Sequence, residues 1–495
     1  MMVWMPMQKK LISNLAIIPL LVGLQGCFTD TSDYEPSDNY LSSEPFDGED
    51  QGDSRDQNHF YFSYDDSAST ASRDLTLFAL NSGKIPHASL GRAYEYLNAE
   101  QIGQFDSSPV GPFQVSMGLM QVEAGELAIL SSEESVAALG VSVSGPIREQ
   151  SERENIVLTL LVDVSGSMAS WYAPETANDI STLLDVTKLG LSEMHSSLKD
   201  GDVVNLVTFS TQASVLLEGW EFDEGNNELQ QEIDALETIS STNLDAGIQL
   251  AYAVAARTYD QAKSNRVLIL TDAYANVGQV DSSVIAQSVF INELEGIHFS
   301  GVGIGDDFND AFLNELTELG KGSYASMITP QDAERLFTEE FIRFIDVAVE
   351  DVVFRLDYPS SWRHISSAAE ETSLEQGDIQ PINFAFNSDQ FFYEGFELPS
   401  ESDSDEEFTL TIEYRAESGE IVSKTITKTV EDMSSVGEDE ILSASAVVTL
   451  ANLVSEAIDC EDIQGSSLLE STSNHPVFIK YAAAIETFCS LSTPN

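Results

Sequence analysis

The chain contains 495 residues, 42% of them hydrophobic and 21% charged, which is enough apolar material for two to four folded domains. Asp and Glu number 83 against 22 Lys and Arg, so the formal net charge is -61. Charge of this sign repels phosphate backbones and excludes nucleic-acid binding, whereas salt or divalent cations would screen it. The motifs of metalloproteases (HExxH), P-loop proteins and serine hydrolases (GxSxG) are absent, and we expect no catalysis.

The N-terminus has the pattern of a secretory signal peptide over residues 1–26. Lys9 and Lys10 precede an apolar stretch at 11–24, which is too short to be a membrane span. The residues that end at Cys27 resemble a bacterial lipobox, in which the cysteine is lipidated and becomes the mature N-terminus. The resemblance implies an exported, lipid-anchored protein of the Gram-negative outer membrane, because no Asp follows the cysteine. An ordinary signal peptide with an incidental cysteine is the alternative.

Residues 27–60 are predicted to form an acidic, disordered tether. Positions 28–60 contain ten Asp or Glu and one Arg, with Ser, Pro and Gly between them. Such a segment has too little apolar surface to fold, and repulsion between its charges keeps it extended. We therefore expect the tether to provide reach between a membrane anchor and the folded part.

Residues 61–150 are predicted to be an α+β flanking region. Apolar spacing indicates helices at 70–80 and 90–97, and shorter apolar runs indicate strands at 113–122, 126–130 and 135–144.

Strands and helices then alternate over residues 151–350. Strands are predicted at 155–162, 202–209, 214–218, 266–271, 297–304 and 323–328. Helices are predicted at 180–198, 228–239, 244–263, 282–294, 310–319 and 330–349. The first strand is an almost uninterrupted apolar run, as expected of a strand buried on both faces. The alternation predicts the α/β fold class, with a doubly wound, mostly parallel, Rossmann-like sheet.

Residues 351–435 return to a β-rich pattern, with strands predicted at 351–356, 408–414 and 423–430, and residues 436–495 are predicted to be helical. Both ends of a parallel α/β domain emerge on one face, so the β-rich segments before and after it are close enough to pair. We therefore interpret the α/β domain as an insertion in a β-rich module, with two separate β pieces as the alternative. Cys460 and Cys489 are predicted to form a disulfide, because an exported protein folds in an oxidising environment.

Side chains with oxygen atoms lie in three predicted loops, two of them directly after predicted strands. Asp163, Ser165 and Ser167 come after the first strand, Thr242 lies in the turn before the helix at 244–263, and Asp272 follows a buried strand. Ligands of an open parallel sheet bind beyond the carboxyl ends of its strands, so these side chains are expected to meet there. Two carboxylates and three hydroxyls suit a hard cation such as Mg²⁺, with Mn²⁺ or Ca²⁺ as alternatives.

The sequence Asp163-x-Ser165-x-Ser167, together with Thr242 and Asp272, resembles the metal-ion-dependent adhesion site of a von Willebrand factor type A domain. The resemblance implies that the two Ser and the Thr ligate the metal, and that the two Asp act directly or through water. It also implies that a remaining metal position accepts an Asp or Glu carboxylate of a partner protein.

This chain departs from the family at Ala273, which replaces the usual Gly. An Ala held at positive φ would cost about 1 kcal/mol of strain.

A looser resemblance extends over most of residues 60–490. Segments at 62–70 and 83–86, the loop at 271–278 and the segment at 345–354 are similar to YfbK-like bacterial lipoproteins with a von Willebrand factor A domain. The function implied is metal-dependent protein binding or adhesion. A scaffold or assembly subunit of a periplasmic complex, with a structural metal site, is the alternative.

Three aromatic residues, Trp171, Tyr172 and Tyr274, lie on loops predicted to flank the metal site. Exposed aromatic side chains at this position would contact a partner protein. Packing within the loops explains the same residues equally well.

Overall fold

The computed structural model describes residues 58–64, 69–123, 135–170, 180–239, 241–273, 296–399, 403–416, 418–434, 436–463, 468 and 473–492. Several predictions lie outside these residues: the signal peptide and Cys27, the tether up to residue 57, the strand at 126–130, the helix at 282–294, and Trp171, Tyr172 and Tyr274. No helix within the described ranges has the length and apolar character needed to cross a membrane.

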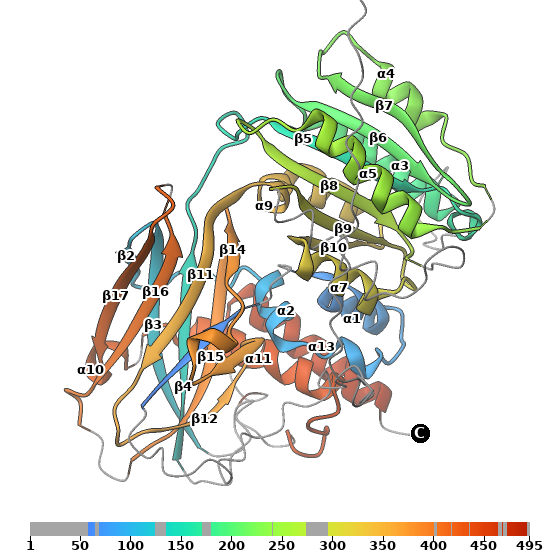
Figure 1. The fold of residues 1–495 in the computed structure, drawn as a ribbon. Helices are drawn as coiled ribbons and strands as arrows, with labels where there is room; N and C mark the ends of the chain where they lie inside the picture. Colours follow the sequence, from blue (N-terminus) through green and yellow to red (C-terminus); the bar gives the residue numbers. More distant parts are fainter. Residues whose placement is uncertain are drawn as a thin grey trace, which may run out of the picture. The chain divides into compact units, whose positions relative to one another are not determined.

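The central α/β domain is built on a sheet with the strand order β10-β9-β8-β5-β6-β7 (Figure 1). The bounds are β5 Ile156–Asp163, β6 Val203–Phe209, β7 Ala213–Glu221, β8 Ser264–Thr271, β9 His298–Ile304 and β10 Lys321–Met327. All pairs are parallel except β6 with β7, which is antiparallel. Every residue of β5 is buried, as its apolar sequence predicts. The predicted fold class is confirmed.

Helices cover both faces of this sheet (Figure 1). They are η2 Gly166–Ala169, α3 Leu183–Ser196, α4 Glu228–Asp234, α5 Leu244–Thr258, α7 Asp310–Leu319, α8 Pro330–Glu334, the π-helical turn η3 Arg335–Glu339, and α9 Phe341–Ile345. Apolar residues of α3, α4, α8 and α9 share one core with the sheet, and those of α5 and α7 share the other. Two apolar cores on opposite faces explain why the central strands carry no polar face.

The helix predicted at 330–349 ends earlier than expected. It breaks into α8, η3 and α9, and the chain turns into strand β11 at Val347. The residues from Val347 onward include β-branched Val349, Val352 and Val353, and β11 pairs with β14 and β16. Strand partners from distant parts of the chain therefore override the helical spacing at 347–349.

A β-sandwich formed by two further sheets flanks the α/β domain. One sheet has the order β13-β1-β11-β16-β17 with β14 also paired to β11, and the other has the order β12-β15-β4-β3-β2. The first contains β1 His59–Ser63, β11 Val347–Asp357, β13 Glu371–Ser373, β14 Ile382–Ala385, β16 Glu407–Arg415 and β17 Ile421–Thr429. The second contains β2 Ser108–Val110, β3 Phe113–Glu123, β4 Ser135–Ser144, β12 Arg363–Ser367 and β15 Asp389–Glu397. One apolar cluster joins the two sheets.

Strands from before and after the α/β domain pair directly in this sandwich. β4 and β15 are antiparallel neighbours over nine positions, from Asp389 opposite Ser144 to Glu397 opposite Val136. The chain thus leaves the sandwich after β4, forms the α/β domain, and returns through β11.

The prediction of a tether up to residue 60 is wrong at its C-terminal end. His59 and Phe60 belong to β1, which pairs with β11 and β13. Phe60 and Phe62 are buried in the sandwich core, and this burial outweighs the acidic character of the preceding sequence.

Further helices lie outside the α/β domain. They are α1 Ala71–Asn81, η1 Ala88–Leu90, α2 Ala93–Ala99, η4 Gln376–Asp378, α10 Val430–Met433, α11 Glu438–Val454 and α13 Pro476–Ser492. A single apolar cluster contains residues of α1, α2, α11 and α13. The structure contains the predicted disulfide between Cys460 and Cys489, with the two Cα atoms 5.7 Å apart.

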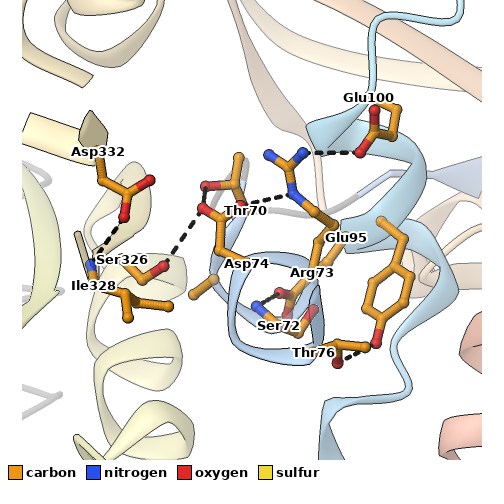
Figure 2. A network of polar contacts seen from close by, with 12 residues as sticks. Thr70, Ser72, Arg73, Asp74, Thr76, Glu95, Glu100, Ser326, Ile328 and Asp332 are labelled. Carbon is orange, nitrogen blue, oxygen red and sulfur yellow. Dashed lines mark hydrogen bonds and ion pairs between the residues drawn. The ribbon is translucent and has the colours of Figure 1, made fainter. Parts of the chain in front are cut away.

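A network of partly and fully buried ion pairs links this helical region to the α/β domain. Figure 2 shows its part around Arg73, Asp74 and Glu100. Its members, called here the flank network, are Arg73, Asp74, Glu100, Arg335, Glu340 and Lys480. Arg73 lies between two carboxylates, 2.8 Å from Asp74 and 2.8 Å from Glu100. Arg335 of η3 reaches Asp74 at 3.1 Å, and Lys480 of α13 pairs with Glu100. Three separate parts of the chain therefore share one set of charges.

Candidate metal centre

The first loop of the candidate centre follows β5 directly. Asp163 is the last residue of β5. Ser165 lies just before the short helix η2, and Ser167 lies within it. The side chains of Asp163 and Ser165 are fully buried. The backbone N–H of Ser165 donates to Asp163 Oδ1 at 2.8 Å, and the hydroxyl oxygens of Ser165 and Ser167 are 2.9 Å apart. The loop thus brings its three predicted ligands together.

The second loop contributes Thr242, which is buried. Backbone bonds hold this loop against its neighbours: the N–H of Ile239 donates to the carbonyl of Val164 at 2.6 Å, and the N–H of Asn243 donates to that of Ser210 at 2.7 Å. Ser241, directly before Thr242, has a left-handed φ of 72°. The Asn243 side chain caps α5 by accepting from Ala246 N–H at 3.2 Å. Thr242 therefore lies between a strained residue and a helix cap.

The third loop follows β8 and carries Asp272, which is also buried. The residue before it, Thr271, donates its hydroxyl proton to Asp163 Oδ2 at 2.6 Å. The residue after it, Ala273, has a left-handed φ of 59°. This is the position where the family usually has Gly. The N–H of Asn309 donates to the Asp272 carbonyl at 3.1 Å and attaches the loop to the start of α7. All five predicted ligand residues thus lie on three adjoining loops at the carboxyl edge of the sheet.

Asp163 carries a buried negative charge that no Lys or Arg of the described residues balances through an ion pair. The pKa of Asp163 is raised to about 6, chiefly by burial and also by the charge of Asp272. The hydrogen bonds from Thr271 and Ser165 oppose this rise and are included in that value. Within the described part of the chain, no Lys or Arg forms an ion pair with Asp163. A buried carboxylate next to a second one, with hydroxyl oxygens around it, is a donor set that fits a hard divalent cation.

Sequence reasoning did not identify Thr271 as part of the centre. Its hydroxyl contacts Asp163 from another strand, and only the fold shows this contact. The available signal was its position as a polar residue at the end of a buried strand, directly before Asp272. The aromatic residues proposed for partner contact, Trp171, Tyr172 and Tyr274, lie outside the described residues.

The comparison with known families decides what this domain is. Residues 158–275, which span all three loops up to Ala273, match the family model of the von Willebrand factor type A domain. This chain contains a von Willebrand factor type A domain. A domain of this type supports a role in protein interaction or adhesion.

Relatives of this von Willebrand factor A protein are bacterial. It is 25% identical over 284 residues to the uncharacterised protein YfbK of Escherichia coli (strain K12), a match that covers 57% of this chain and 47% of YfbK. It is 22% identical over 267 residues to the uncharacterised protein sll0103 of a Synechocystis species, covering 52% of this chain and 60% of that protein. The chain thus spans about half the length of the curated relatives it matches. The family match and these relatives support a bacterial, YfbK-like protein with a von Willebrand factor A domain.

Among solved structures, a von Willebrand factor type A protein from Catenulispora acidiphila is similar at 14% sequence identity and a TM-score of 0.44. The match covers 78% of this chain and 89% of that one.

Proposed function

We propose that this protein binds a partner protein through a Mg²⁺ ion held by Asp163, Ser165, Ser167, Thr242 and Asp272, without catalysis. The observation that carries the proposal is the burial of Asp163 beside Asp272, with no ion pair from a Lys or Arg in the described ranges to Asp163. A buried carboxylate without a basic partner, such as Asp163, is costly, and a divalent cation would remove that cost. Mn²⁺ and Ca²⁺ are the alternative metals for the same oxygen ligands.

The carboxylates of the proposed site supply negative charge, and its hydroxyls supply neutral oxygen ligands. When bound, the metal supplies an electrophilic position for a carboxylate from outside the chain. Two carboxylates balance a 2+ charge, while the three hydroxyls add ligands without adding charge, so an additional carboxylate from a partner is still attracted. The backbone N–H of Ser165 and the hydroxyl of Thr271 hold Asp163 in one orientation. The chain thus provides a preformed cradle, and the partner provides an Asp or Glu.

The test combines metal binding with partner capture. Calorimetry should show Mg²⁺ binding by the wild type and none by Asp163→Ala or Ser165→Ala. The matched control is Asp245→Ala, which removes a nearby acid in the first turn of α5 that is not among the proposed ligands. Partners captured in Mg²⁺ and released by chelator from the wild type, and not captured by Asp163→Ala, would support adhesion. Equal Mg²⁺ affinity in wild type and Asp163→Ala would contradict the metal site.

A scaffold or assembly subunit with a structural metal is the second candidate function. The flank network favours it, because buried ion pairs tie Arg335 of the α/β domain to Asp74 of α1. Such ties suit a domain that holds a fixed place in a larger body. Partners that remain bound in chelator, and that bind Asp163→Ala equally well, would support the scaffold and contradict metal-dependent adhesion.

We further propose that Cys27 carries a lipid that anchors the protein to the outer membrane. The support is the lipobox-like sequence that ends at this cysteine. One acyl chain binds a membrane only marginally, whereas several hold it firmly. The variant Cys27→Ser should accumulate unprocessed or in a soluble form. A variant that still matures and fractionates with outer membranes would contradict the anchor.

A further inference from the structure

The carboxyl edge of the sheet, with the five proposed ligands, is called here the metal edge. There the hydroxyl of Thr271 makes two hydrogen bonds, one as donor and one as acceptor. It donates to Asp163 Oδ2 at 2.6 Å and accepts from the backbone N–H of Ala273 at 2.8 Å. A hydroxyl has one proton to donate, and here it goes to the carboxylate, while its lone pair takes the amide. Thr271 itself is fully buried at the end of β8. Water therefore does not replace either bond at no cost.

The first bond sets the orientation of Asp163. Its Oδ1 accepts from Ser165 N–H at 2.8 Å, and its Oδ2 accepts from Thr271. One donor belongs to the loop after β5 and the other to β8, so the two bonds fix the plane of the carboxylate relative to two strands. Without the hydroxyl, Oδ2 would lose its donor from the neighbouring strand, and the carboxylate would be held only by the loop after β5.

The second bond acts on the other carboxylate through the backbone. Asp272 lies between Thr271 and Ala273, and Ala273 is buried with a left-handed φ of 59°. A non-glycine residue in this region is strained and persists only where its surroundings hold it. The bond from Ala273 N–H to Thr271 spans Asp272 and closes the turn that carries it. Loss of that bond would let the turn relax and move Asp272.

We propose that Thr271 is a positioning residue of the metal centre, whose hydroxyl holds Asp163 and Asp272 together in the arrangement that binds the cation. The inference rests on the proposed function, since it concerns the same Mg²⁺ site. Thr271 need not touch the metal. Outer residues that orient metal ligands typically change metal affinity by 10- to 100-fold when they are replaced.

The decisive variants differ in the hydroxyl and in little else. Thr271→Val keeps the shape and the β-branched character but removes both hydrogen bonds, and Thr271→Ser keeps the hydroxyl. Calorimetric titration with MgCl₂ should show at least a 10-fold weaker affinity for Thr271→Val, and an affinity within about 3-fold of wild type for Thr271→Ser. Thr271→Ala also lacks the hydroxyl and serves the same purpose if the valine variant does not fold.

A matched control separates positioning from general damage to the sheet. Thr159→Val removes a buried threonine hydroxyl from β5 that accepts from Asn205 Nδ2 at 2.9 Å, away from the loops. This variant should bind Mg²⁺ with wild-type affinity. Thermal unfolding in chelator gives a second readout, because both valine variants should lose stability while only Thr271→Val loses metal affinity.

The contribution through Ala273 is measured in a second background. Glycine adopts positive φ without strain, so Ala273→Gly no longer needs the bond that closes the turn. Thr271→Val should therefore weaken Mg²⁺ binding less in the Ala273→Gly background than in the wild type. Equal losses in both backgrounds would overturn the part of the proposal that concerns Asp272.

The remaining outcomes are distinct from failure of the proposed function. Wild-type Mg²⁺ affinity in Thr271→Val overturns the positioning role while the metal site stands. A Thr271→Ser variant as weak as Thr271→Val also overturns it, because the hydroxyl would then not be what matters. A wild type that binds no Mg²⁺ overturns the proposed function, and this inference with it.

Discussion

Two regions of this protein bury carboxylates, and they treat the charge in opposite ways. At the metal edge, Asp163 and Asp272 are buried close enough for the charge of one to raise the pKa of the other. In the flank network, Asp74 and Glu100 share Arg73 (Figure 2). Each has a further cation, Arg335 for Asp74 and Lys480 for Glu100. The acids of the flank network thus have several cations from the chain, whereas Asp163 forms no ion pair with a Lys or Arg of the described residues.

The pKa shifts of the acids in the two regions differ according to whether a cation of the chain is close. Burial alone would raise the pKa of Glu100, but Arg73 and Lys480 outweigh it, and the net pKa lies below its ordinary value. Burial raises the pKa of Asp163 to about 6, with no described cation to oppose it. Asp74 is intermediate: its pKa stays raised by burial in spite of Arg73 and Arg335. The paired acids connect parts of the chain, whereas we propose that Asp163 takes its cation from solution.

The largest expected effect is on the compensated side. Arg73→Met should lower the free energy of unfolding by about 3 kcal/mol, because it leaves two buried carboxylates short of a shared cation. Urea unfolding measures the loss, with Arg257→Met as the control. Arg257 pairs with Glu218 at an exposed site, where solvent screens the pair, so the control should leave the free energy of unfolding nearly unchanged. Equal losses in the two variants would contradict the importance of burial.

The uncompensated side should respond to the metal instead. Mg²⁺ at 100 times its dissociation constant should raise the free energy of unfolding by about 2.7 kcal/mol in the wild type. Asp163→Asn should show no such gain, while Arg73→Met should show the full gain from its lower starting point. The measurement is urea unfolding in MgCl₂ and in chelator. A wild type with identical unfolding curves in both would remove the distinction between the two regions.

Glu318 offers a test of an acid away from the metal edge whose pKa burial raises in spite of a nearby cation. Its pKa is raised to about 7, chiefly by burial and then by the charges of Glu95 and Glu315, while Arg92 and the Asn314 side chain oppose the rise. The folded-state pKa lies above the ordinary value of 4.5, so stability falls as pH rises from about 4.5 to about 7, and the penalty is complete above 7.

Glu318→Gln removes this penalty. The variant should be about 2 kcal/mol more stable than wild type at pH 8 and equal to it near pH 4.5. Chemical unfolding at a series of pH values between 4.5 and 8 gives the difference directly. A difference that does not change with pH would show that Glu318 is not the group responsible.

The smallest expected effect concerns the strain beside the metal edge. Ala273→Gly should raise the free energy of unfolding in chelator by about 1 kcal/mol, since glycine accepts the left-handed φ of 59° without strain. Ala253→Gly, at an exposed position within α5, should have the opposite sign, with a loss of about 1 kcal/mol. Losses in both variants would mean that the turn at Ala273 is relaxed.

Much of the α/β domain could be predicted from its sequence, because its signals are local. The apolar run that became β5 needs no knowledge of its neighbours, and the helical spacing of α7 matches the structure residue for residue. The five metal-edge residues could be grouped before the structure was known, because strand ends of a parallel sheet meet at one edge. These inferences depend on periodicity and on a general property of parallel sheets.

Other features depended on partners that local pattern does not reveal. The segment at 347–349 has helical spacing but forms a strand, because β14 and β16 are there to pair with it. His59 and Phe60 follow an acidic segment, yet they form a strand because β11 and β13 lie on either side. In both places a ladder of backbone hydrogen bonds with distant residues outweighs the local tendency.

The sequence by itself determined which elements form in the α/β domain and which side chains stand at its carboxyl edge, since both follow from the spacing of apolar and polar residues. Only the tertiary structure decided which buried acids are compensated. Lys480 pairs with Glu100 across 380 positions of sequence, whereas the partner that Asp163 finds 108 positions away is the neutral hydroxyl of Thr271. Charge compensation depends on distances of a few ångströms between such residues, and packing sets those distances.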